Sequence, residues 1–131
     1  MQTDLVIIGG GPGGYRAAGY AARDGLSVVV AEPNQAGGTC PTAGCIPTKC
    51  LAHDASAAPS DFASAMERKA LVTQQLRTGV EQLLSSPGIA LVKGQAAFTD
   101  EHTVTIGDTT VEADNIIIAT GSESRMPPIT G

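Results

Sequence analysis

The sequence is poor in aromatic side chains and in charge. It has no Trp, two Tyr and two Phe among 131 residues, whereas Gly occurs 16 times. A core built from Val, Ile, Leu and Ala with many tight turns favours a parallel α/β sheet over a β-sandwich. The length is that of one domain with a single core.

Basic residues and long apolar runs are also scarce. Lys and Arg total 8 against 13 Asp and Glu, a formal net charge of −5 without a basic cluster. This argues against nucleic acid and anionic membranes as partners. The longest apolar runs, such as Leu5–Ile8 and Ile116–Ala119, have the length of a strand and are far too short to span a bilayer. Because the N-terminus does not resemble a signal peptide, we expect a cytoplasmic protein.

The hydrophobic pattern predicts strands and helices in alternation, followed by short β segments. Phe62 and Met66 recur at helical spacing and are expected in the core. Helices are predicted at 13–24, 48–57 and 61–84, and strands at 4–8, 27–31, 89–93, 95–98, 103–106, 109–112 and 115–119, the last of these buried.

Residues 9–14 read Gly-Gly-Gly-Pro-Gly-Gly between a predicted strand and a predicted helix. This is the context that the dinucleotide motif G-x-G-x-x-G requires. Gly9 would allow the tight turn, Gly11 would leave room for a pyrophosphate, and Gly14 would let the helix lie close to the strand. The free N–H groups at the helix N-terminus would then face the phosphates. The alternative is a glycine-rich turn that binds nothing.

A carboxylate ends the second predicted strand. Glu32 lies 18 residues after Gly14, where it could accept hydrogen bonds from both ribose hydroxyls of a nucleotide. An acidic group at this point disfavours a 2′-phosphate. The residues therefore predict a dinucleotide with an ADP moiety, as in NAD or FAD, without choosing between the two.

One short segment, GGTCPTAGCIPTKC, holds all three cysteines. On a regular helix, residues five apart differ by about 140° in direction and about 7.5 Å in rise, which a disulfide does not span. Pro41 and Gly44 supply a distortion that could bring Cys40 and Cys45 together. The helix that follows would hold Cys50 away, so the favoured pair is Cys40 with Cys45.

The chemistry of this segment has three interpretations. A metal site would need Cys40, Cys45, Cys50 and His53, whose spacing matches none of the usual zinc or iron–sulfur patterns. A structural disulfide is disfavoured in a reducing compartment. Lys49 near a helix start would stabilise a thiolate, as a redox-active pair requires. These arguments favour redox chemistry but leave the choice open, and Cys50 is expected as a small buried side chain.

Taken in order, the motifs resemble the class I pyridine nucleotide–disulfide oxidoreductases, the family of dihydrolipoamide dehydrogenase, glutathione reductase and mercuric reductase. The resemblance covers essentially all 131 residues, and its most specific part is the block G-G-T-C-x4-C-I-P-T-K. It implies a Rossmann-like FAD-binding domain, with a parallel sheet and a small antiparallel β segment. The motifs that carry it are Gly9-x-Gly11-x-x-Gly14, Glu32, the block Gly37–Lys49 and Ala119-Thr120-Gly121.

The resemblance also implies which residues contact FAD. Glu32 would hold the adenosine ribose, Thr39 would lie along the pyrophosphate, and the backbone near Ala96 would meet the adenine. The full set of cofactor contacts implied is Gly9, Gly11, Pro12, Gly13, Gly14, Glu32, Gly38, Thr39, Cys45, Lys49, Ala96, Ala119, Thr120 and Gly121.

In the same family Cys45 would form the charge-transfer thiolate against the flavin, Cys40 would be the interchange thiol, and Lys49 would lie beside flavin N5. Electrons would pass between NAD(P)H, FAD and the Cys40–Cys45 pair, to or from a disulfide or dithiol substrate. The Ile-Pro-Thr-Lys sequence after the second cysteine favours dihydrolipoamide dehydrogenase or a mercuric-reductase-like relative.

Parts of the family pattern have no counterpart in this sequence. These are the NAD(P) domain, the later segment that completes the FAD site, and the C-terminal dimerisation domain with its His–Glu acid/base pair. Neither His53 nor His102 lies in a matching context. We therefore expect residues 1–131 to be the N-terminal FAD-binding part of a longer homodimeric enzyme, inactive in isolation. The competing hypothesis is a non-catalytic dinucleotide-binding module.

Overall fold

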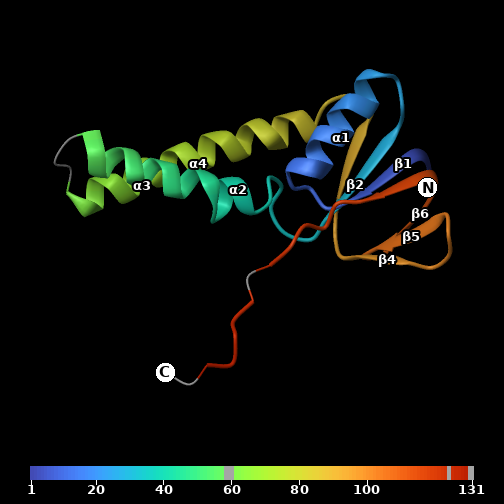
Figure 1. Ribbon diagram of the computed structural model, residues 1–131. Coiled ribbons are helices and arrows are strands. Elements are labelled where there is room, and N and C mark those ends of the chain that lie inside the picture. Colours follow the sequence, from blue (N-terminus) through green and yellow to red (C-terminus); the bar gives the residue numbers. More distant parts are fainter. Residues whose placement is uncertain (58–60, 124, 130–131) are drawn as a thin grey trace.

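A computed structural model describes residues 1–57, 61–123 and 125–129. Its centre is a six-stranded sheet with strand order β3-β2-β1-β6-β5-β4 (Figure 1). The elements are β1 Gln2–Ile8, α1 Pro12–Arg23, β2 Val28–Glu32, α2 Thr39–Thr42, α3 Cys45–Ala57, α4 Phe62–Leu84, β3 Ile89–Lys93, β4 Ala96–Phe98, β5 Thr103–Ile106 and β6 Thr109–Ile118.

The sheet is parallel on one side and antiparallel on the other. β3, β2, β1 and β6 run parallel, with Ile7 of β1 opposite Val30 of β2 and Ile117 of β6. β5 and β4 continue the sheet in antiparallel order. This confirms the predicted Rossmann-like fold with a small antiparallel segment. The carboxyl ends of the four parallel strands meet at one edge, where open α/β sheets bind their ligands.

Apolar side chains cover both faces of the sheet. Because successive side chains of a strand point to opposite faces, an unbroken apolar strand needs cover on both. One cluster lies under α1 and the end of α4 and comprises Leu5, Ile7, Ala18, Val28, Val30, Ala36 and Leu84. The other lies under the antiparallel strands and comprises Val6, Val29, Ala31, Val104, Ile106, Val111 and Ala113.

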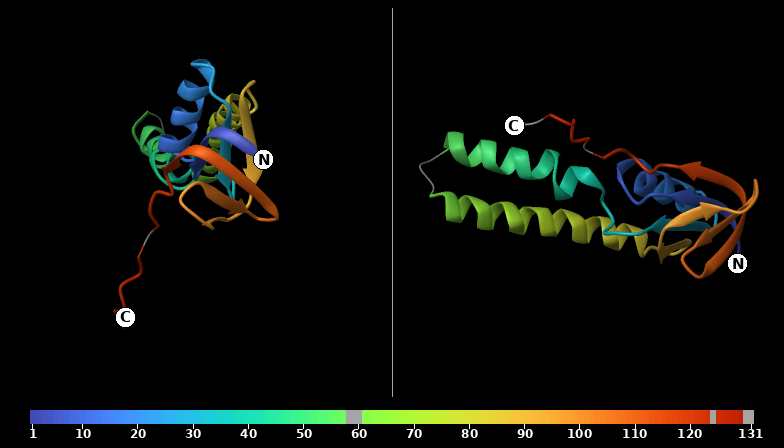
Figure 2. Two further views of the ribbon diagram at one scale, coloured as in Figure 1. Left: turned by 90° about the vertical axis from the view of Figure 1, so that its right-hand side faces the viewer. Right: turned by 90° about the horizontal axis from the view of Figure 1, so that it is seen from below.

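Helices α3 and α4 form an antiparallel hairpin that projects from the sheet (Figures 1 and 2). Asp61 begins α4, since its carboxylate accepts a hydrogen bond from the Ser64 backbone N–H at 3.0 Å. Across the hairpin, the Arg68 guanidinium on α4 contacts the Asp54 carboxylate on α3 at 2.8 Å. Among the described residues, no helix is both long enough and apolar enough to span a membrane.

Three expectations need correction. The helix predicted from residue 48 begins at Cys45 and is preceded by the short α2, which was not predicted. The core assignment of Phe62 is wrong, because this side chain is 75% exposed at the far end of the projecting hairpin. Strand β6 is one continuous strand. Ile118 in its second half is 67% exposed, because its side chain packs against neither of the two apolar clusters.

Candidate nucleotide and dithiol site

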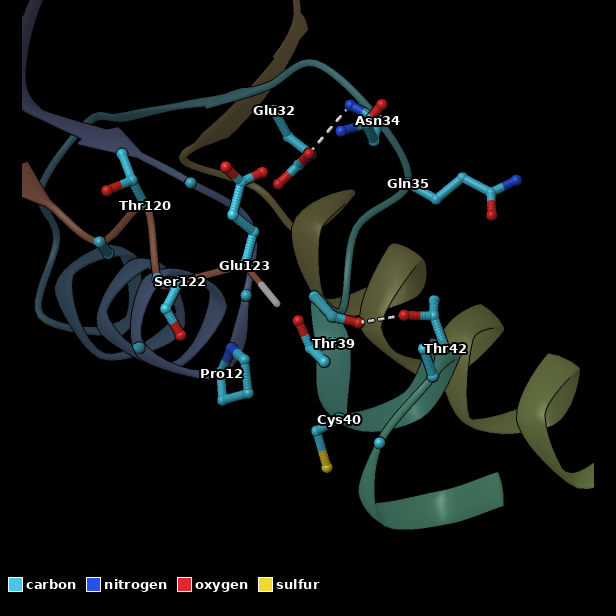
Figure 3. Close-up of a pocket in the computed structure, with 18 of the residues that line it drawn as sticks. Pro12, Glu32, Asn34, Gln35, Thr39, Cys40, Thr42, Thr120, Ser122 and Glu123 are labelled. Atoms are coloured by element: carbon cyan, nitrogen blue, oxygen red, sulfur yellow. Dashed lines mark hydrogen bonds between the residues drawn. The ribbon is translucent and has the colours of Figure 1, made fainter. Parts of the chain in front are cut away.

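A cavity of about 1330 Å³ lies at the carboxyl ends of the parallel strands (Figure 3). Its walls come from the loop after β1, the loop after β2, α2, the start of α3 and the segment after β6. Twelve of the residues predicted from the sequence line it, namely Gly9, Gly11, Pro12, Gly13, Glu32, Gly38, Thr39, Cys40, Cys45, Ala119, Thr120 and Gly121. Residues far apart in the chain thus share one cavity.

The glycine loop owes its shape to two close approaches. Gly9 has φ of +109°, and a Cβ there would overlap the carbonyl oxygen of Ala119. Gly14 is buried, and a Cβ on it would overlap the carbonyl oxygen of Gly9. Gly14 therefore fixes the approach of α1 to the loop and does not line the cavity.

Helix α1 presents an uncapped N-terminus at this cavity. Its N-cap is Gly11, no side chain caps it, and its first turn holds no acidic residue. Pro12 occupies the first turn, where a missing N–H removes no helical hydrogen bond. The partial positive charge of the helix end is therefore available to an anion such as a pyrophosphate.

The Glu32 carboxylate is held in place by backbone N–H groups. Its Oε2 accepts from the Gly10 N–H at 2.8 Å and its Oε1 accepts from the Asn34 N–H at 2.9 Å. Figure 3 shows this side chain facing the cavity. Each carboxylate oxygen keeps a further lone pair, so the group can accept from a hydroxyl as well.

Two thiols lie where α2 meets α3. Cys40 is on α2 and half-buried, Cys45 is the first residue of α3 and exposed, and all three cysteines are free. The chain bends between the helices at Gly44, whose carbonyl oxygen accepts from the Thr48 N–H at 3.2 Å and the Thr48 hydroxyl at 2.8 Å. Cys40 and Cys45 are therefore two free thiols. They lie on either side of the helix interruption that the sequence predicts at this point.

The surroundings of Cys40 favour its protonated form. A hydrogen bond with the Cys45 side chain is the largest cause that raises the pKa of Cys40, followed by burial and by repulsion from charge on Cys45. The positive charge of Lys49 lowers the pKa of Cys40, but this effect is smaller. At neutral pH the Cys40 thiol thus keeps its proton.

Three predicted contact residues lie outside the lining of the cavity. Gly14 is buried beneath the loop, Lys49 is exposed on α3, and Ala96 pairs with Ile106 in the antiparallel part of the sheet. The cavity is reached instead by Lys93, the last residue of β3.

Sequence reasoning missed several residues that line the cavity. Lys93 could have been found by the rule that ligands lie at the carboxyl ends of parallel strands, had β3 been placed beside β2. The other missed residues are neighbours of the predicted motifs, and their residue types do not by themselves indicate a binding role. The missed lining residues are Pro33, Asn34, Gln35, Thr42, Ala43, Gly44, Lys93, Ser122 and Glu123.

The structure separates the residues considered for a metal site. Cys50 is 6% exposed, and its backbone carbonyl accepts from the Arg68 guanidinium at 3.2 Å. His53 has its Nδ1 atom 3.3 Å from the Asp54 carboxylate and 3.4 Å from the Arg68 guanidinium on α4. Over residues 1–57, 61–123 and 125–129, no three His, Cys, Asp or Glu side chains are grouped to hold a metal ion.

The fold and this cavity define a dinucleotide-binding α/β domain with a dithiol beside the ligand site. Residues 3–131 match the family model described as pyridine nucleotide-disulphide oxidoreductase, and the chain belongs to this family. The resemblance inferred from the motifs is thereby confirmed.

Curated relatives and solved structures agree with this assignment. Dihydrolipoyl dehydrogenase of Haloferax volcanii is 40% identical over 96% of this chain and 31% of its own length. The Pseudomonas aeruginosa enzyme of the same name is 35% identical over 98% of this chain. The Cu(II) complex of the HOCl-induced flavoprotein disulfide reductase RclA from Escherichia coli superposes with a TM-score of 0.93 at 36% identity, over all of this chain and 31% of that one. The chain thus spans about a third of the length of its relatives.

Proposed function

We propose that this chain is the FAD-binding, dithiol-bearing part of a flavoprotein disulfide oxidoreductase, similar to dihydrolipoamide dehydrogenase. The observation that carries the proposal is that the glycine loop, Glu32 and the thiols of Cys40 and Cys45 all line one cavity. A dinucleotide held by the glycine loop and Glu32 at one end would extend with its other end toward the thiols.

The donors and acceptors of the cavity suit FAD. The uncapped start of α1 would hold the pyrophosphate, and the fixed carboxylate of Glu32 would accept from the ribose hydroxyls. The cavity volume of about 1330 Å³ exceeds the range of about 300–1,000 Å³ that is usual for small ligands, as a dinucleotide requires. When bound, FAD would supply the two electrons that regenerate the dithiol, with NAD(P)H as the hydride donor.

The chain's own thiols would carry out the exchange with substrate. In the reducing direction, deprotonated Cys40 attacks the substrate disulfide, forms a mixed disulfide and releases the first substrate thiol. Cys45 then attacks the Cys40 sulfur, which releases the second substrate thiol and leaves the Cys40–Cys45 disulfide. The substrate gains two electrons and two protons, and the protein dithiol loses the same number.

The raised pKa of Cys40 implies that this exchange needs a proton acceptor. We propose that the acceptor, the NAD(P) site and the homodimer contacts belong to a longer, cytoplasmic parent protein, and that the 131-residue chain alone does not turn over. Lys49 would approach the flavin, and the backbone at Ala96 the adenine, as parts of that parent.

The test is FAD binding by the purified chain, followed by visible absorption and equilibrium dialysis. We expect binding to the wild-type chain. Glu32→Gln should weaken it about tenfold or more, because a hydrogen bond to a charged group contributes about 1.5–3 kcal/mol. Glu112→Gln removes the same charge on the exposed surface of β6 and serves as the control.

A long-wavelength absorption band that appears with dithiothreitol, and is lost in Cys45→Ser, would support the redox role of the pair. FAD binding without any such band would favour the non-catalytic dinucleotide-binding module. A chain that binds no FAD, or in which Glu32→Gln changes nothing, would contradict the proposed site.

A further inference from the structure

A second cavity, of about 470 Å³, lies between the outer face of α4 and α2. Four residues of α4 line it at four-residue spacing, namely Lys69, Thr73, Arg77 and Glu81. Such spacing places side chains on one face of a helix. Thr42 of α2 forms the opposite wall. We refer to this cavity as the α4 groove.

The α4 groove collects hydrogen-bond donors and positive charge in a chain whose formal net charge is −5. Lys69 and Arg77 contribute two cations, while Glu81 is the single acidic residue of its lining. Thr73, Gln74 and Thr78 add side chains that can donate hydrogen bonds. This donor set matches an anion that accepts several hydrogen bonds.

Two of these donors are buried without a hydrogen-bond partner among the described residues. They are the Thr73 hydroxyl and the Nε atom of Arg77. Buried polar atoms without partners are uncommon and costly in native proteins. Thr73 and Arg77 are one turn apart on the wall of the same groove. Because both atoms are covered by neighbouring atoms, an acceptor in the groove would reach them only after the Arg77 side chain turns toward it.

We propose that the α4 groove binds an oxyanion, either a phosphate or a carboxylate group. The planar guanidinium of Arg77 can donate two hydrogen bonds to two oxygens of a phosphate or carboxylate group, an arrangement that a halide ion cannot match. Lys69 adds charge from the adjacent turn. The site is separate from the glycine loop and does not depend on FAD binding.

The α4 groove shares a wall with the cavity at the carboxyl ends of the parallel strands. Thr42 lines both, and its hydroxyl donates to the Gly38 carbonyl at 2.7 Å. The aliphatic part of Arg77 lies 3.9 Å from the Cβ position of Gly37 and lines the turn that precedes Cys40. An anion on Arg77 would therefore be held directly behind the segment that carries Cys40.

The experiment is titration of the 131-residue chain with inorganic phosphate, followed by ³¹P NMR and by isothermal calorimetry. We expect saturable binding that weakens about tenfold or more in Arg77→Met, which keeps the apolar stem and removes the charged donors. Thr73→Val removes the hydroxyl at similar volume and should weaken binding by a smaller factor. Arg23→Met, on the exposed surface of α1, changes the net charge equally and should leave the affinity unchanged.

Malonate, titrated in parallel, separates the two sources of the oxyanion. Tighter phosphate binding would assign a phosphate group, and tighter malonate binding a carboxylate. The proposal is overturned if neither anion binds saturably, or if Arg23→Met weakens binding as much as Arg77→Met. Urea unfolding verifies that each variant is folded. If Arg77→Met does not fold, Thr73→Val still tests the proposal.

Discussion

The sheet and the helical hairpin differ in how much they bury. The sheet has apolar clusters on both faces, and Val6, Ile7 and Val30 are 0% exposed. Along the hairpin, away from the sheet end of α4, the buried hydrophobic residues are Cys50 and Ala65. Its exposed apolar residues include Phe62, Leu71 and Leu76. Because most of the buried apolar side chains lie in or on the sheet, we expect this region to supply most of the folding free energy.

The candidate site lies where these two regions meet. The glycine loop and Glu32 belong to the sheet, whereas Cys40 and Cys45 lie at the base of the hairpin. The proposed nucleotide contacts thus belong to the region with the most buried side chains. The positions of the thiols are determined by α2 and α3, which are held by hydrogen bonds and by the ion pair between Asp54 and Arg68. This division suggests that binding and thiol chemistry can be perturbed separately.

The largest expected effect is a substitution in the sheet. Ile7→Ala should lower the free energy of unfolding by about 2–5 kcal/mol, because it leaves a cavity in a fully buried cluster. Leu71→Ala on the exposed face of α4 should change it by less than about 0.5 kcal/mol. Urea unfolding followed by circular dichroism measures both. Equal losses would show that the hairpin contributes as much as the sheet.

A smaller effect is expected at the thiols. Cys45→Ala removes the hydrogen bond that is the largest cause raising the pKa of Cys40. The pKa of Cys40 should fall, so that the thiolate fraction and the rate of alkylation by iodoacetamide rise near neutral pH. Lys49→Met should act in the opposite direction, since Lys49 lowers the pKa of Cys40.

Mass spectrometry of the Cys40 peptide across a pH series gives the alkylation midpoint. A lower pKa also lowers the nucleophilicity of a thiolate, so the midpoint is the better measure than the rate at one pH. An unchanged midpoint in Cys45→Ala would mean that the two side chains do not interact.

The smallest effect is expected for the ion pair across the hairpin. A hydrogen bond from Arg68 is the largest cause lowering the pKa of Asp54 below 3.8. A carboxylate with a lowered pKa stabilises the fold above its ordinary pKa and loses that contribution as pH falls through the lower value. Asp54→Asn should therefore reduce the hydrogen-exchange protection of α3 at pH 5.

The same variant should show a weaker loss of protection between pH 5 and pH 3 than the wild-type chain. Hydrogen bonds from Ser64 also lower the pKa of Asp61 at the start of α4. Because Asp61 is present in both proteins, the difference in pH dependence between the wild-type chain and Asp54→Asn reports on Asp54 alone. Asp108→Asn, on an exposed turn, is the matched control. Equal pH dependence in all three would exclude a role for the pair.

Much of this protein is determined by local sequence. The unbroken apolar runs at Leu5–Ile8 and Val28–Ala31 specify buried strands in any parallel sheet. The glycines at 9, 11 and 14 specify a turn that side chains would block, and Glu32 follows because it ends the next strand. Such features depend on residues close in the chain, so the fold class and the part of the cavity lining formed by the glycine loop and Glu32 could be predicted.

Tertiary structure alone decided the features that depend on distant partners. Strand β3 follows α4 in sequence, but its parallel pairing with β2 places Lys93 at the cavity. Phe62 has helical spacing, yet it is 75% exposed, because it is the first residue of α4 in a hairpin that projects from the sheet (Figure 2). The α4 groove exists because α2 lies across α4. Periodicity reports which face of an element is apolar, whereas long-range pairing fixes which element covers it.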